Sequence, residues 1–371
     1  MAYSVRLGQV IDQVVAPRAV EVDRSGRFPR DAVTALGDAK LLGLLSPAED
    51  GGGGESLDAA AQVIERLAGV CGSTAMVVVM HYAAAAVLEA HGSPEVRRAI
   101  GENRHLCTLA FSEFGSRSHF WAPVGTAKRH DGHIVLDGSK SWVTAAGEAD
   151  SYVWSSLPVG DSGRMTLWHL PKDTPGLTTR GEFDGLGLRG NASSPMTAEG
   201  VEVPADAMLG TDGDGLDIAL ATALPRFLVL NAAFCLGLME ALLADAKAHL
   251  SRTKLSHLDQ TLAEQAGRRG EFARLHTRTA EVRLFLRDTL DALAYGREDA
   301  MLRVLQVKLV AGEAAAEVAD GVMRLCGGTA LLRDTGIERR FRDSLAARVM
   351  APTSEALRDF TGRALLGLPL F

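Results

Sequence analysis

The sequence predicts a multidomain α+β protein in which an N-terminal α-helical domain, a central antiparallel β-barrel and a C-terminal four-helix bundle follow one another. Three observations predict this order. Apolar residues recur at helical spacing at both ends of the 371-residue chain, the middle alternates with a period of two, and all four tryptophans lie in that middle. We place the three domains at residues 1–105, 106–215 and 216–371.

The first region reads as helices because residues 5–22, 29–45 and 56–92 carry apolar side chains three and four positions apart. Gly51–Gly54 predicts a turn between two of them. This glycine run is no phosphate-binding loop, because no strand precedes it and no Gly-Lys-Ser/Thr follows it. The apolar run at residues 74–88 is too short to span a bilayer, so we expect no membrane segment.

The middle region reads as short strands separated by Gly, Pro, Asp and Asn, which is typical of an antiparallel barrel or sandwich. From about residue 216 the helical period returns in three long segments, at residues 216–250, 261–296 and 300–328. Long helices with one apolar stripe usually pack as an antiparallel bundle.

Composition excludes several functions. The net charge of −7 gives no basic surface for nucleic acid. The four cysteines form no CxxC pair and have no histidine at metal-ligand spacing, so we expect reduced thiols and no metal. The start of the chain has no pattern of a secretory signal, and we expect a cytoplasmic protein.

Residues 336–366, GIERRFRDSLAARVMAPTSEALRDFTGRALL, closely resemble the C-terminal signature of the acyl-CoA dehydrogenases, VER-x-x-RD, YEGT-[SN]-E and A-R-x-L-L. Four further segments resemble that family in the same order. They are PRDAVTALGDAKLLGLLSPAEDGGGGESLDAAAQVIERLA, LAFSEFGSRSHF, LDGSKSWVTAAGEADSYVW and GLGLRGNASSPMTAEGVEVPADAMLG. The resemblance covers essentially the whole chain and implies the same three-domain fold, a flavin cofactor (FAD in preference to FMN) and a homodimer or homotetramer.

The resemblance also implies where the flavin binds. Ser112, with Glu113 beside it, and the segment that includes Trp142 and Thr144 match residues that line the isoalloxazine, and Ser118 matches a serine near the flavin phosphates. A further group matches residues that reach the adenosine half of FAD or the subunit interface: Arg252, Gly327, Gly328, Thr353 and Glu355. Departures at Leu255, Ala263 and Arg324 fall in the same motifs and weaken the case for ordinary cofactor binding.

The family's catalytic base is missing. Where the signature has Glu-Gly, this chain has Ala351-Pro352. Some members carry the base on a long helix in a Leu-Glu-Arg motif, and here Pro225 stands in that place before Arg226. Arg226 matches the motif's arginine, and we expect it to have lost its anionic partner. Dehydrogenation of an acyl thioester needs a group that removes the α-proton, which neither alanine nor proline can do.

Two histidines are candidates for proton transfer. By resemblance, His81 lies on a helix that borders the acyl pocket, and oxygenases of this fold often carry a histidine there. The alternative is a core histidine with satisfied hydrogen bonds. The second candidate is His119, which stands where the family's Gly-Ser-Asp segment has its acid. We also predict a catalytic role for Arg226.

The leading hypothesis is therefore a flavin-dependent oxidoreductase of biosynthetic metabolism that acts on an acyl thioester of CoA or an acyl carrier protein with a non-standard base. A flavin-dependent monooxygenase on the same fold is the first alternative. The second is a non-redox or catalytically silent member of the family, which a colourless purified protein would favour.

Overall fold

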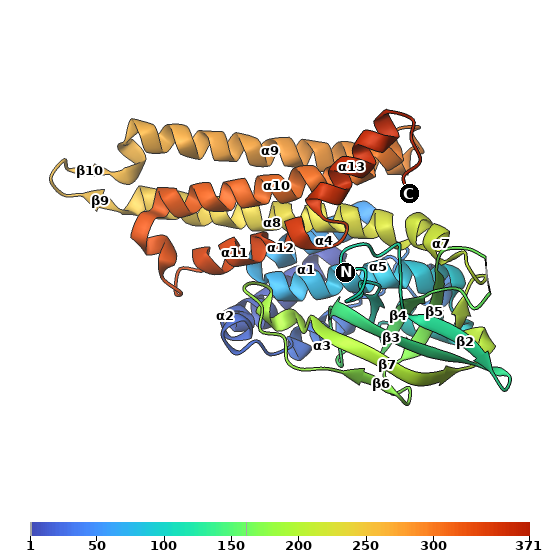
Figure 1. Cartoon of the computed structure of the whole chain (residues 1–371). Coiled ribbons are helices and arrows are strands. Elements are labelled where there is room, and N and C mark those ends of the chain that lie inside the picture. The colour runs from blue at the N-terminus through green and yellow to red at the C-terminus, as the bar shows by residue number, and fades with distance from the viewer. Residues whose placement is uncertain (1, 161) are drawn as a thin grey trace. The chain divides into compact units, whose positions relative to one another are not determined.

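The computed structural model describes residues 2–160 and 162–371 and has the predicted order of helices, then strands, then helices (Figure 1). A π-helical turn at Ile11–Val15 joins the first two helices. Ser93 caps α6 by accepting a hydrogen bond from the Val96 N–H, and Pro94 follows it in the first turn. The N-terminal helices are α1 (Tyr3–Val10), α2 (Ala16–Ser25), α3 (Arg30–Asp38), α4 (Leu57–Val70), α5 (Gly72–His91) and α6 (Pro94–Gly101).

The turn expected at the glycine run is present. Gly51 and Gly54 have φ of 86° and 60°, which side chains rarely adopt. A Cβ on Gly52 would lie 2.2 Å from the Ser46 carbonyl oxygen, so only glycine fits there. This turn fixes the position of Ser46 at the start of the loop.

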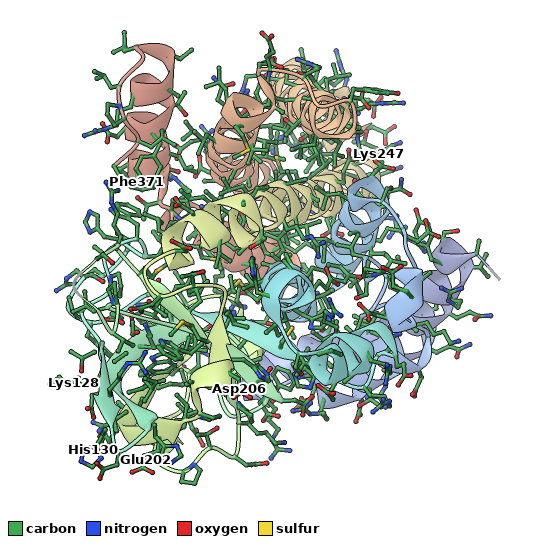
Figure 2. The ribbon with its side chains drawn as sticks, turned by 90° about the vertical axis from the view of Figure 1, so that its right-hand side faces the viewer. Lys128, His130, Glu202, Asp206, Lys247 and Phe371 are labelled. Atoms are coloured by element: carbon green, nitrogen blue, oxygen red, sulfur yellow. The ribbon has the colours of Figure 1, made fainter. Side chains whose placement is uncertain are left out.

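The strands form two four-stranded sheets, with the orders β1-β4-β5-β8 and β2-β3-β7-β6. Among the strands that the structure describes, β1 and β4 run parallel and are connected through β2 and β3, and the other pairs are antiparallel. Lys128 and His130 of β2 lie at the same end of the second sheet as Glu202 of β7 (Figure 2). The strands are β1 (Cys107–Ala110), β2 (Thr126–His130), β3 (His133–Val143), β4 (Ser151–Ser156), β5 (Thr166–Pro171), β6 (Leu177–Thr179), β7 (Ser194–Val203) and β8 (Met208–Leu209).

The C-terminal part is helical, as predicted. Helix α10 packs against α9, α11 and α13, and a short hairpin of β9 (Lys254–Leu255) and β10 (Gln260–Thr261) joins α8 to α9. The helices are α7 (Gly215–Ala221), α8 (Ala223–Arg252), α9 (Ala266–Ala294), α10 (Ala300–Cys326), α11 (Ile337–Ser344), α12 (Ala346–Val349) and α13 (Ser354–Leu365).

The chain divides into two compact units. The first unit comprises Met1–Ala60, Met76–Gly185 and Arg189–Phe227, and the second comprises Ala61–Ala75, Leu186–Leu188 and Leu228–Phe371. The three domain boundaries that we predict from sequence stay a prediction. Two described helical stretches, Gly72–His91 and Gly215–Arg252, are long and apolar enough to cross a membrane, but 83% of the apolar window is buried in each, as in core helices.

Candidate functional site

A fully buried ion pair lies beneath the segment of Ser112 in the first unit. The Nζ of Lys140 on β3 lies 2.5 Å from the Glu113 Oε1, and neither side chain is exposed. The other Glu113 oxygen accepts hydrogen bonds from the N–H groups of Val124 and Gly125, at 2.7 and 2.8 Å. Burial lowers the pKa of Lys140 to about 8, and Glu113 opposes that shift. These contacts with Lys140 and two backbone N–H groups tie the Glu113 carboxylate into the protein and hold the loop in place.

Lys140 links this loop to two strands. Its Nζ also donates to the backbone oxygen and the hydroxyl of Ser155 on β4, at 2.6 and 2.7 Å. The Ser141 N–H donates to the Ser112 carbonyl oxygen at 2.9 Å. The half-buried Ser112 and the strand that leads to Trp142 are thus fixed relative to each other by one buried cluster.

Trp142 is presented to the surface by an irregular backbone. The register of β3 against β7 shifts between Lys140 and Val143, and such bulges turn a side chain in a new direction. Trp142 has φ of 57°, which is rare for a bulky residue, and its relative exposure is 69%. Two residues on, Thr144 is buried and its Oγ1 lies 3.1 Å from the Ser193 Oγ. The result is a flat, exposed aromatic face on a rigid support.

The loop between β1 and β2 holds Ser118 and His119. Ser118 is half-buried, whereas His119 is exposed with its Nδ1 3.1 Å from the Ser116 carbonyl oxygen. The Ser116 Oγ is buried and has no hydrogen-bond partner among the described residues. A bound group that accepts or donates hydrogen bonds would satisfy it.

His81 has the environment of a core residue. It is fully buried, its Nε2 lies 3.2 Å from the Leu42 carbonyl oxygen, and its Nδ1 accepts a hydrogen bond from the Cys107 N–H at 3.2 Å. Burial lowers the pKa of His81 to about 4, so the ring is neutral at physiological pH. Both ring nitrogens have backbone partners, and the catalytic role stays a prediction.

Arg226 has a carboxylate partner that the sequence does not reveal. Its Nη1 lies 2.8 Å from the Oε2 of Glu89 on α5, and the other Glu89 oxygen accepts a hydrogen bond from the Ser46 hydroxyl at 2.7 Å. The exposed fractions of the Arg226 and Glu89 side chains are 26% and 8%. From the sequence, the loss of a glutamate at Pro225 leaves Arg226 without an anion, and the structure corrects that inference.

The remaining predicted residues lie in the second unit. Arg252, at the end of α8, is exposed. Gly327 has φ of 59° and, like Gly328, open space where a Cβ would be. Thr353 caps α13 by accepting a hydrogen bond from the Ala356 N–H at 3.3 Å. Glu355 is exposed, and its Oε1 lies 3.5 Å from the Arg358 Nη1. Their cofactor contacts stay predictions.

Lys308 holds the segment where the family has its base. Its Nζ donates to the carbonyl oxygens of Ala347, Met350 and Pro352 at 2.8, 2.9 and 2.8 Å. Burial lowers the pKa of Lys308 to about 7. The backbone at Ala351 is therefore fixed even though its side chain is only a methyl group.

Sequence reasoning missed Glu89, Lys140 and Lys308. Lys140 and Lys308 interrupt otherwise apolar faces of a strand and a helix, which is a usable signal for a buried charge. Glu89 has no such signal, because Arg226 is 137 residues away along the chain. Within the first unit, the structure joins Ser112 to the Trp142 strand and Glu89 to Arg226.

Three profiles of the acyl-CoA dehydrogenase family match the chain: the N-terminal domain at residues 5–102, the middle domain at 108–201 and the C-terminal domain at 213–366. Cyclohex-1-ene-1-carbonyl-CoA dehydrogenase of Geobacter metallireducens is 29% identical over 365 residues, covering 96% of this chain and 95% of the relative. The structure of butyryl-CoA dehydrogenase from Megasphaera elsdenii has a TM-score of 0.91 at 22% identity and covers 98% of each chain. FkbI, for biosynthesis of a methoxymalonyl extender unit, has a TM-score of 0.87 at 26% identity and covers 98% of this chain and 100% of its own.

Proposed function

Because this chain belongs to the acyl-CoA dehydrogenase family, we propose that it is a flavin-dependent oxidoreductase that binds FAD and oxidises an acyl thioester. The observation that supports this most is the exposed Trp142 indole on its strained, bulged strand, tied through Lys140 to the Ser112 segment. A flat aromatic side chain beside a rigid polar loop fits a planar ring system with hydrogen-bonding edges.

When bound, the flavin supplies the acceptor for a hydride from the substrate's β-carbon. The task of the protein is to orient the thioester, exclude water and remove the α-proton. Ser112 and Thr144 match residues that line the isoalloxazine, and we expect them to offer hydrogen bonds to the flavin edge. The buried Glu113–Lys140 pair would keep the Ser112 loop from moving. The Ser116 hydroxyl, which has no hydrogen-bond partner among the described residues, adds a donor to the same loop.

The substrate is proposed to be an acyl-CoA with a specialised acyl group. The names of the relatives favour CoA as the carrier, and one of them acts on a cyclic acyl-CoA. The likeness to FkbI, which serves a biosynthetic pathway, supports a role outside ordinary fatty-acid oxidation, as does the loss of the usual base at Ala351. An acyl carrier protein is the alternative carrier. We expect a cytoplasmic homodimer or homotetramer.

The visible spectrum of the purified protein tests the cofactor, and acid release followed by chromatography distinguishes FAD from FMN. We expect a yellow protein whose flavin is bleached anaerobically by one member of a panel of CoA and carrier-protein thioesters. A colourless protein that takes up no FAD would contradict the proposal. An unbleached flavin that, once reduced, consumes O₂ and places one of its oxygen atoms in a substrate would instead identify the monooxygenase.

A further inference from the structure

A short segment at residues 191–194 is bound to the turn at the end of β3. The Ala145 N–H donates to the Asn191 carbonyl oxygen at 2.9 Å, and the Ala146 N–H donates to the Ala192 carbonyl oxygen at 3.1 Å. These bonds continue the pairing of β3 with β7 beyond the two strands, and both segments belong to the first unit. The turn and the segment therefore form one rigid clasp.

Three residues of this clasp have left-handed backbone conformations that are rare for residues other than glycine. The φ angle is 57° at Trp142, 58° at Ala145 and 50° at Ala192. Such conformations persist only where the surrounding contacts enforce them, and they gather at ligand-binding sites. The backbone of the clasp is thus more strained than a simple connection requires, which points to a function for the side chains that it presents.

Two buried hydroxyl groups face each other inside the clasp. The Thr144 Oγ1 lies 3.1 Å from the Ser193 Oγ, and the exposed fractions of the two residues are 2% and 8%. Ser193 is itself held in place, because its N–H donates to the Asn191 Oδ1 at 3.2 Å. Each hydroxyl carries one proton, and the single hydrogen bond between them uses only one of the two. Neither hydroxyl has another hydrogen-bond partner among the described residues, so the second proton is left for a bound acceptor.

We propose that Ser193 is a positioning residue of the flavin site: its hydroxyl donates to the Thr144 Oγ1 and so leaves the Thr144 proton for a hydrogen-bond acceptor on the edge of the ring system. This rests on the proposed function, in which Thr144 offers a hydrogen bond to the flavin. A lone hydroxyl rotates and points its proton in several directions, whereas a donor fixed on one side directs that proton away from itself. The segment at residues 191–194 thus adds a positioning group to the site of Ser112, Trp142 and Thr144.

The test is a double-mutant cycle in which FAD affinity is measured by flavin fluorescence. Ser193→Ala removes the donor to Thr144, and Thr144→Val removes the hydroxyl that Ser193 orients while keeping the shape of the side chain. We expect Ser193→Ala to weaken FAD binding about fivefold in the unaltered background and by less than about twofold in the Thr144→Val background. The matched control is Ser139→Ala, at an exposed serine of β3, which should bind FAD as the unaltered protein does.

The reduction potential of the bound flavin is a second readout, which a merely structural role of Ser193 would not move. A hydrogen-bond donor at the ring edge stabilises the electron-rich reduced ring more than the oxidised ring. The potential should therefore fall in Ser193→Ala and in Thr144→Val, and it should fall no further in the double variant than in Thr144→Val.

Two outcomes would overturn the proposal: an unchanged FAD affinity in Ser193→Ala, or an equal weakening by Ser193→Ala in both backgrounds, since Ser193 would then act without Thr144. If Ser193→Ala does not fold, Ser193→Cys takes its place in the cycle with the same expected contrast, because a thiol has a similar size but is a weak donor. An unaltered protein that takes up no FAD would reject the proposed function and this inference together, whereas FAD binding without the contrast would reject the inference alone.

Discussion

The buried Glu113–Lys140 pair offers the sharpest test of how the flavin segments are held. Glu113→Gln keeps the shape of the side chain but leaves the Lys140 ammonium without its counter-ion in a fully buried site. Breaking a buried ion pair by changing one partner costs about 3–5 kcal/mol. The entropy of unfolding is about 2.1 cal/mol/K per residue, so cooperative unfolding of this 371-residue chain has a total entropy of roughly 0.8 kcal/mol/K. Dividing the lost free energy by this entropy predicts that the midpoint of thermal unfolding of Glu113→Gln falls by about 5 °C.

The assay is thermal unfolding followed by circular dichroism, with FAD binding measured in parallel by flavin fluorescence. We expect Glu113→Gln to weaken FAD binding as well, because the pair fixes the loop of Ser112. The double variant Glu113→Gln/Lys140→Met removes both charges, and it should recover most of the lost stability. The exposed pair Arg363–Asp359 gives the control: Asp359→Asn should change stability by about 0.5 kcal/mol or less. A Glu113→Gln protein as stable as the unaltered one would refute the reasoning.

Three further predictions follow from buried or exposed groups. The pKa of His81 is about 4 in the folded protein and about 6.5 in the unfolded chain. Because the unfolded chain binds the proton first, the free energy of unfolding falls by about 3 kcal/mol as the pH falls from 6.5 to 4. The free energy of unfolding of His81→Asn, measured with urea, should depend less on pH in that window. Lys308→Met leaves three carbonyl groups without their donor, so we expect a loss of about 3 kcal/mol at pH 7. Because the pKa of Lys308 is about 7 in the folded protein, the unfolded chain binds more protons between about pH 7 and 10, and the free energy of unfolding of the unaltered protein rises over that range. Lys308→Met should show a smaller rise, and an unchanged dependence on pH would contradict the lowered pKa of Lys308. Trp142→Ala should weaken FAD binding at least tenfold, measured by fluorescence titration, without loss of stability. An affinity for FAD equal to that of the unaltered protein would show that Trp142 does not contact the flavin.

The order of helices and strands could be predicted from periodicity because each element has its own apolar face. The parallel pairing of β1 with β4 could not, because Cys107 and Ser151 pair across the intervening β2–β3 hairpin and no local pattern indicates that pairing. The fold class is nevertheless confirmed, by the structure and by the three family domains.

The candidate site could be predicted only where local motifs carry it. Trp142 and Thr144 are predicted from their own segment, but the bulge that exposes the indole depends on pairing with β7. The Glu89–Arg226 contact joins residues from two helices far apart in sequence, so no spacing rule indicates it. The sequence has alanine at position 351, where the family signature has its base, but no local motif indicates that Arg226 has Glu89 as its carboxylate partner.

The central claim is that this protein oxidises an acyl thioester by passing electrons to a bound flavin. The most direct measurement is the visible absorbance of the FAD-loaded protein during anaerobic titration with the thioester panel. The account predicts stoichiometric bleaching by at least one thioester, with the matching unsaturated acyl product found by mass spectrometry. A flavin that stays oxidised with every thioester would contradict it.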